Sequence, residues 1–143
     1  MKKLLGIVVL GLLWCSVSFS HEAPKTTEAK QDYIKNYLVL FEIEATNCNF
    51  GGDEKTPCLR YAIKNIGSET LKKIEVIVYF LDKNGKAFFE KKYHPISIYS
   101  IDGVLKPNYT YRRNKDTYMS IENLGDEWSG KVKIEIVDIE FAE

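Results

Sequence analysis

From Tyr37 onward, apolar and polar residues alternate with a period of two, which predicts strands that bury one face. In the first alternating run, the side chains that point one way are Val39, Phe41, Ile43 and Ala45. Those that point the other way are Glu42, Glu44 and Thr46. A second alternating run covers residues 59–64 and ends at a turn signal over residues 65–68. Two strands are therefore expected between residues 37 and 65.

The next run, residues 74–81, is apolar on both faces. One face carries Ile74, Val76, Val78 and Phe80, and the other carries Ile77, Tyr79 and Leu81. This pattern is typical of a central strand, or of a strand whose outer face is covered by something else. Residues 82–85 then predict a hairpin turn, because the Asn-Gly pair supplies the positive φ angles that such turns need.

A short strand is expected over residues 96–101, and the final strand changes phase within itself. Val132, Ile134 and Ile136 share one face, whereas Val137, Ile139 and Phe141 lie on the opposite phase. Such a change indicates a bulge or a crossing between sheets. About seven strands without a long helix predict one all-β domain over residues 37–143, folded as an antiparallel β-sandwich.

Residues 1–20 have the pattern of a secretory signal peptide. Two lysines open the chain, an apolar run follows, and serines stand at the −3 and −1 positions for cleavage before His21. The apolar run is short for a membrane anchor, so the mature chain is expected to lack a transmembrane segment. We therefore predict a cleaved leader of bacterial type and a mature protein that is periplasmic or secreted.

Lipid attachment at Cys15 is the less favoured alternative, because the preceding residue is Trp14, where such signals normally carry a small residue. Residues 21–36 are polar and read as a mobile lead-in segment, with a short helix over residues 29–35. Removal of the leader leaves two cysteines, Cys48 and Cys58. An even pair in an oxidising compartment predicts a disulfide rather than a zinc or redox site.

The charges of the chain do not favour nucleic acid or anionic lipid as a partner. The formal net charge is zero for the whole chain and about −2 once the two leader lysines are removed. Binding to such polyanions needs clustered lysine and arginine. The basic pairs at residues 91–92 and 112–113 are interpreted as solvated strand faces. No nucleic-acid contact and no cofactor are expected.

Catalysis is also disfavoured. A serine or cysteine nucleophile needs a histidine base, and the only histidines are His21 and His94. The alternative is copper binding, because cleavage before His21 would create a terminal amine next to an imidazole, and copper prefers nitrogen ligands. His94 could complete that site. Because a rigid site needs ligands on rigid elements, a periplasmic copper-binding protein remains the second choice.

Two resemblances follow from local motifs. The segment 105–111 resembles the L-x-P-x-x-x-Y corner of fibronectin type III and other immunoglobulin-like domains. The resemblance implies that Tyr111 bonds back to the chain upstream, that Leu105 is buried, and that Tyr109 is more exposed. Asn108 stands where those domains usually have glycine, and asparagine also tolerates turn geometry.

The segment 59–87 is similar to FxLYD-type domains of secreted bacterial proteins. These domains have an N-x-G turn, an apolar strand and a D-x-x-G-K hairpin, which correspond here to residues 65–67, 76–82 and 82–86. The chain departs from them at Phe80-Leu81, where Leu-Tyr would be expected. By analogy, the resemblance implies an immunoglobulin-like accessory or adhesion module.

These observations predict a non-catalytic exported binding or accessory module of the bacterial cell envelope. Its partner is expected to be a protein or another envelope component. The predicted contact residues are Ile77 and Tyr79, because the run that contains them is too apolar for a strand with one wet face. Either the lead-in around Tyr33 and Ile34 covers this face, or a partner does.

Overall fold

The computed structural model describes residues 26–48, 56–100, 103–113 and 124–143. The predicted leader (1–20), with Cys15, and the predicted new terminus His21 lie outside these ranges. The described residues form one α-helix, one 3-10 turn and six strands. In chain order these are α1 Thr27–Tyr37, β1 Leu38–Asn47, β2 Pro57–Asn65, β3 Leu71–Leu81, β4 Ala87–Ile96, β5 Thr110–Arg113, η1 Gly125–Glu127 and β6 Lys131–Phe141.

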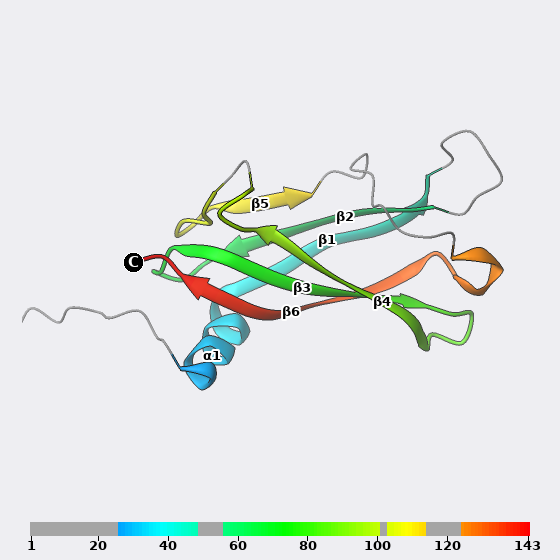
Figure 1. The fold of residues 1–143 in the computed structure, drawn as a ribbon, viewed down its shortest axis with the longest axis horizontal. Helices are drawn as coiled ribbons and strands as arrows, with labels where there is room; N and C mark the ends of the chain where they lie inside the picture. The colour runs from blue at the N-terminus through cyan, green and yellow to red at the C-terminus, as the bar shows by residue number, and fades with distance from the viewer. Residues whose placement is uncertain (1–25, 49–55, 101–102, 114–123) are drawn as a thin grey trace, which may run out of the picture.

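The strands of the described residues form two three-stranded antiparallel sheets, ordered β1-β2-β5 and β4-β3-β6. Figure 1 shows the two sheets as separate layers, with α1 beside the C-terminal end of β6. The predicted all-β, antiparallel architecture is confirmed. The expected number of about seven strands stays a prediction, since residues 114–123 lie outside the described ranges.

Buried side chains of both sheets form a single core. The members from β2 and β3 are Leu59, Tyr61, Ile63, Leu71, Ile74, Val76, Val78 and Phe80. β3 lies between β4 and β6, so the prediction of a central strand over residues 74–81 is confirmed. The side chains of β3 alternate between buried and half-buried positions along its length. Its inner face therefore builds the core and its outer face lies at the surface.

The turn between β3 and β4 is the predicted hairpin, with a different geometry. Among residues 82–85, only Gly85 has a positive φ, at 79°. The Asp82 carboxylate accepts hydrogen bonds of 2.8 Å from the backbone N–H groups of Asn84 and Lys86. The loop is thus longer than a two-residue turn, and an aspartate side chain supports it from within.

β1 differs from the predicted alternation because it contains a bulge. Between Phe41 and Glu44 the register with β2 shifts, and Glu42 takes a φ of 53°. The extra residue reverses the phase of the strand. Leu38, Leu40 and Ala45 contact the core, whereas Val39 is 42% exposed. The expectation that Val39, Phe41, Ile43 and Ala45 share one face is therefore wrong.

The phase change predicted in the final strand is confirmed as a bulge. In β6, Asp138 pairs with Glu75 and Ile136 with Val76, so Val137 is the extra residue. The carbonyl of Val137 accepts a 3.1 Å hydrogen bond from Nε2 of Gln31 in α1. Lys30 of α1 also contacts the bulge, because its Nζ lies 3.0 Å from Oδ1 of Asp138.

Part of the predicted lead-in segment is therefore folded and packed against the sheets. Residues 27–37 form α1, which begins after the N-cap Thr26 and extends beyond the short helix expected over residues 29–35. The helix covers the edge of β6 with Gln31 and Lys30, and coverage of an edge strand prevents pairing with other chains. Tyr33 is the buried residue of the helix and belongs to the core.

The strand expected over residues 96–101 is wrong within the described part of that segment. β4 ends at Ile96, and residues 97–100 form a turn. The Ser100 hydroxyl accepts a 3.0 Å hydrogen bond from the N–H of Ser97 and donates one of 2.6 Å to its carbonyl oxygen. Serine hydroxyls compete in this way with the hydrogen bonds of a sheet.

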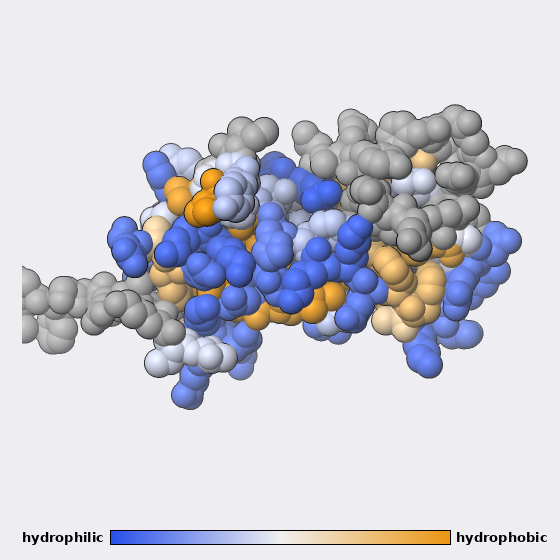
Figure 2. Space-filling model, viewed as in Figure 1, coloured by the Kyte–Doolittle hydropathy of each residue, from blue (hydrophilic) through white to orange (hydrophobic). Residues whose placement is uncertain are grey.

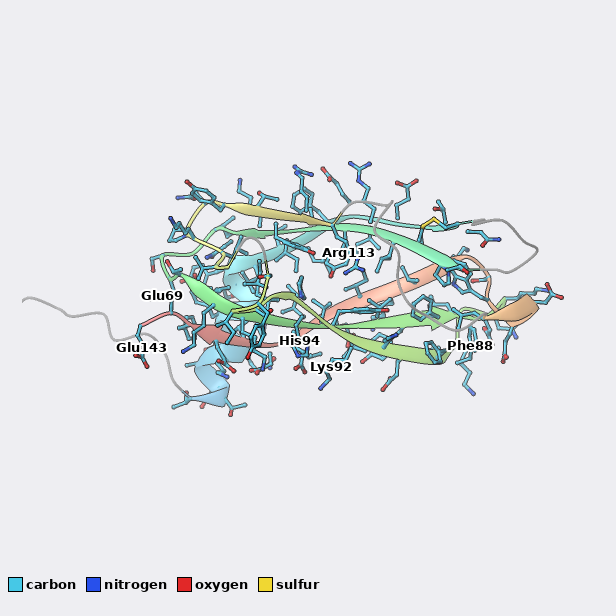
Figure 3. All side chains as sticks on the ribbon, turned by 45° about the horizontal axis from the view of Figure 1, so that its top comes forward. Glu69, Phe88, Lys92, His94, Arg113 and Glu143 are labelled. Carbon is cyan, nitrogen blue, oxygen red and sulfur yellow. A yellow bond between two sulfur atoms is a disulfide. The ribbon has the colours of Figure 1, made fainter. Side chains whose placement is uncertain are left out.

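Cys48 and Cys58 form the predicted disulfide, with Cα atoms 5.4 Å apart. The bond joins the segment after β1 to the start of β2, and Figure 3 shows it at the end of this sheet that lies away from α1. The intervening residues 49–55 are outside the described ranges. The one helix in the described part of the chain is too short and too polar to span a bilayer.

Candidate functional site: the outer face of β4-β3-β6

Ile77 and Tyr79 lie in the centre of the outer face of the β4-β3-β6 sheet. Their neighbours Val76, Val78 and Phe80 point inward and are fully buried, so strand alternation turns Ile77 and Tyr79 outward. Both side chains are half-buried. We call the surface around these two residues the β3 face.

Charged residues flank Ile77 and Tyr79 on both sides. Ile77 pairs with Lys92 of β4 and Glu135 of β6. Tyr79 pairs with Glu90 of β4 and Lys133 of β6. Directly opposite residues of a sheet lie close enough for their side chains to interact. The long charged side chains therefore lie beside the two apolar ones, and their methylene groups can cover part of them.

Glu75 lies at one end of the β3 face, where it contacts two side chains of β4. Its carboxylate lies 2.7 Å from Nζ of Lys92 and 2.9 Å from Nε2 of His94, and its side chain is 13% exposed. Figure 3 labels Lys92 and His94 on β4. The hydrogen bond from Lys92, followed by that with His94, holds the pKa of Glu75 below its usual value, and the Glu75 carboxylate raises the pKa of Lys92.

Tyr79 interacts with charged side chains of β6. Nζ of Lys133 lies 5.9 Å from the centroid of the Tyr79 ring and 2.6 Å from Oε1 of Glu135. Partial desolvation, followed by the Glu135 carboxylate, raises the pKa of the Tyr79 phenol. The phenol is therefore neutral at physiological pH, and its hydroxyl donates a hydrogen bond to the Glu135 carboxylate.

The two residues of the lead-in that were expected to cover the β3 face lie elsewhere. Tyr33 is part of the core, and Ile34 packs against the same core. Figure 2 shows apolar side chains in separate patches among hydrophilic ones on the face in view. The outer apolar side chains of β3 are thus framed by charged side chains of their own sheet.

The structure places the second predicted copper ligand in a hydrogen bond with a glutamate. Nε2 of His94 faces Oε2 of Glu75, and His21 lies outside the described ranges. Within those ranges, no three His, Cys, Asp or Glu side chains are grouped so that they could hold a metal ion. Copper binding through His21 and His94 therefore stays a prediction.

Sequence reasoning missed a second cluster of polar side chains. Arg112 and Arg113 were interpreted as one solvated face, but they point to opposite sides of β5. Arg112 lies over the Phe41 ring, 5.5 Å from its centroid, and pairs with Glu42 on the outside of the sheet. Arg113 pairs in register with the buried Tyr61, and Figure 3 shows it between the two sheets. The alternation of side chains along a strand could have indicated this, because adjacent strand residues such as Arg112 and Arg113 point to opposite faces.

The segment that resembles a fibronectin-type corner has several of the expected features. Leu105 is buried and exchanges hydrogen bonds of 2.8 and 3.0 Å with the backbone of Leu71. Asn108 adopts a φ of 64°, as a turn residue can. Tyr109 is 63% exposed, whereas Tyr111 is half-buried with its ring centroid 6.1 Å from that of Tyr61. The backward hydrogen bond of the Tyr111 hydroxyl stays a prediction.

Beside this corner lies a groove of about 460 Å³ that opens between the end of β4 and β5. It is lined by Ile96, Val104, Leu105, Lys106, Tyr109, Thr110, Tyr111 and Arg112. A second groove of about 350 Å³ lies at the Ser97–Ser100 turn, where Tyr99 is exposed. Comparison of the chain with protein-family models, with curated proteins and with solved structures gave no match.

Proposed function

We propose that this protein is a non-catalytic exported binding or accessory module of the bacterial cell envelope, folded as an immunoglobulin-like β-sandwich of the FxLYD type. Two observations support the sandwich. The two antiparallel sheets share one core, and the corner segment has a buried Leu105 and a turn at Asn108. The leader pattern predicted over residues 1–20 and the Cys48–Cys58 disulfide support export to the periplasm or beyond.

The main support for a binding role is the set of residues on the β3 face. A half-exposed isoleucine and a half-exposed tyrosine stand side by side along a central strand, framed by the Glu75–Lys92 and Lys133–Glu135 pairs. Protein interfaces combine an apolar centre, in which tyrosine is enriched, with a polar rim. The proposed partner is therefore a protein or another envelope component that buries Ile77 and Tyr79.

The test compares two lysine substitutions in a pull-down from cell envelopes. Ile77→Lys places a charge in the centre of the β3 face. Val39→Lys is the matched control, because Val39 is also a half-exposed, outward-facing strand residue but belongs to the other sheet. Both variants should keep the wild-type circular dichroism spectrum. A partner retained by wild type and Val39→Lys and lost with Ile77→Lys supports the proposal.

A partner that Ile77→Lys retains at the wild-type level would remove the β3 face as the binding site. If an envelope preparation yields no protein that wild type enriches over the Ile77→Lys variant, the proposed role is wrong. Tyr79→Ala provides a second variant on the same face, and it should weaken the same interaction without a new charge.

A further inference from the structure

At each lateral margin of the molecule, an edge strand of one sheet lies beside an edge strand of the other. Different groups fill the space between the two sheets at these two margins. On one side lie the edge strands β1 and β6, and α1 packs against both. On the other side lie the edge strands β4 and β5. There the Arg113 guanidinium of β5 lies over the Tyr93 ring of β4, 5.3 Å from its centroid. An arginine between two sheets needs acceptors for its hydrogen bonds, because a buried charge is costly when it is not paired.

Three buried side-chain atoms in the described residues have no hydrogen-bond partner within the geometric limits of such a bond. All three lie between the two sheets at the margin formed by β4 and β5. They are Oη of Tyr61, Oη of Tyr93 and Nε of Arg113. Tyr61 is only 1% exposed, so its hydroxyl cannot be satisfied by bulk water. A buried donor without an acceptor costs free energy, and each such group in a native protein calls for an explanation.

The three groups face one another. Tyr61 and Arg113 are opposite residues of β2 and β5, so their side chains leave the sheet on the same side. The phenol of Tyr61 lies within electrostatic reach of Tyr93 and Tyr111 and close to the Arg113 side chain. Burial raises the pKa of Tyr61, and the charge and hydrogen bonding of Arg113 lower it against that effect. The Tyr111 ring also lines the groove between β4 and β5. Tyr93, Tyr111 and Arg113 are partly exposed as residues, although the three unpartnered atoms are themselves buried.

The cluster is rich in donors and in positive charge. Lys91 stands beside Tyr93 on β4, with its Nζ 5.9 Å from the centroid of the Tyr93 ring. Desolvation raises the pKa of Tyr93 to about 12 and raises that of Tyr61 as well. Both phenols therefore remain protonated at neutral pH and can donate an O–H to an acceptor. The nearby acidic side chains Glu90 and Glu42 lie on the outer faces of β4 and β1.

We propose that Tyr61, Tyr93 and Arg113 form a binding site for an oxyanion, the carboxylate or phosphate group of a ligand that enters between β4 and β5. Such a group carries several acceptor oxygens, which can receive the Nε–H of Arg113 and the two phenol O–H groups at once. Arginine suits planar or tetrahedral oxyanions because its donors are fixed in one plane. The site shares no residue with the β3 face, so it is independent of the proposed protein interface.

The experiment follows the Nε–H signal of Arg113 by ¹H–¹⁵N NMR in the exported protein. Inorganic phosphate and acetate are titrated separately, with sodium chloride keeping the ionic strength constant. We expect a saturable shift with at least one of the two anions. The stronger of them identifies the ligand group as phosphate or carboxylate. Signals of backbone amides in β4 and β5 should move with the same dissociation constant.

Arg113→Gln should weaken the binding of that anion at least tenfold, measured on the β4 and β5 amides. Arg60→Gln is the matched control, because Arg60 is an exposed guanidinium of the same sheet that pairs with Glu42, and it should leave the affinity unchanged. Ile77→Lys should also leave it unchanged, which separates this site from the proposed protein interface. An equal loss in the Arg113 and Arg60 variants would show that only general charge is involved and would overturn the proposal.

Tyr61→Phe tests the unsatisfied hydroxyl directly. In buffer without oxyanions, removal of a buried hydroxyl that has no partner should raise the melting temperature. When the oxyanion is present, the same variant should bind it several-fold more weakly than wild type. A lower melting temperature in oxyanion-free buffer would mean that the hydroxyl is already satisfied by a bound water, and the proposal would then be wrong. Absence of a saturable shift with either anion would overturn it as well.

Discussion

The hydroxyl of Tyr33 in α1 lies 3.0 Å from Oδ1 of Asn65 at the end of β2. The same hydroxyl accepts a 3.0 Å hydrogen bond from the N–H of Glu69, and Nδ2 of Asn65 donates one of 2.7 Å to the carbonyl of Glu69. Asn65 is fully buried, so its hydrogen bond with Tyr33 is shielded from water. These hydrogen bonds join the helix, the end of β2 and the turn before β3.

Tyr33→Phe should lower the free energy of unfolding by about 1–3 kcal/mol. The phenyl ring keeps its packing against Phe141, but the N–H of Glu69 loses its acceptor in a partly buried position. Urea unfolding of both proteins measures the difference. Tyr37→Phe is the matched control in the same helix, because Tyr37 is 44% exposed, and it should change the stability by less than Tyr33→Phe. Equal effects would show that the network does not stabilise the fold.

Gly67→Ala should destabilise the protein by about 1–3 kcal/mol, which is the usual cost of overpacking. A Cβ atom at this position would lie 2.2 Å from the Tyr33 hydroxyl and 2.9 Å from Cβ of Tyr37. The reason is therefore steric, and α1 would have to move away from the turn. Ser68→Ala at the exposed next residue should be nearly neutral in the same urea titration. A neutral Gly67→Ala would mean that the helix can shift without loss.

At acidic pH, the contacts of Glu75 with Lys92 and His94 should contribute less to the free energy of unfolding. Because Lys92 and His94 depress its pKa in the folded state, the unfolded chain takes up this proton first as the pH falls. The contribution is present above the ordinary pKa of 4.5 and is lost as the pH falls through the lower folded value. The stability difference between wild type and Glu75→Gln should therefore shrink in that range. Glu90→Gln, on the same face, serves as the control, and a difference that stays constant would contradict the prediction.

The disulfide should be present in the native protein and should stabilise it. Thiol labelling without reductant should find neither Cys48 nor Cys58 free. Replacement of both by serine should lower the free energy of unfolding by roughly 2.5–3 kcal/mol, the chain-entropy estimate for a loop this short. Reduced wild-type protein should show a similar loss. Full labelling of both thiols in the native protein would show that the bond does not form.

Tyr111→Phe should cost about 1–2 kcal/mol if the hydroxyl makes the corner hydrogen bond that the resemblance implies. Tyr109→Phe is the comparison, because Tyr109 is exposed and should tolerate the change. Thermal unfolding of the two variants provides the measurement. Equal stability of the two would show that segment 105–111 is a turn without the structural role of a tyrosine corner.

Local patterns of the sequence were sufficient for several parts of this structure. The two apolar faces of residues 74–81 predicted the central strand β3, because strands in the middle of a sheet are typically more apolar than edge strands. The phase change at Val137 predicted the bulge in β6, since a single extra residue is visible as a shift in alternation. The cysteine pair likewise predicted the bond between β1 and β2.

Other features depend on contacts between segments far apart in the sequence, and only the tertiary structure decided them. The bulge at Glu42 reverses the face of β1, although the printed pattern alternates without a break. The place where the predicted helix docks depends on Tyr33, whose hydroxyl finds partners at Asn65 and Glu69. Arg113 lies between the sheets because β5 pairs with β2 in the register that sets it opposite Tyr61. Strand register and helix docking are long-range relationships, and periodicity within one segment carries no information about them.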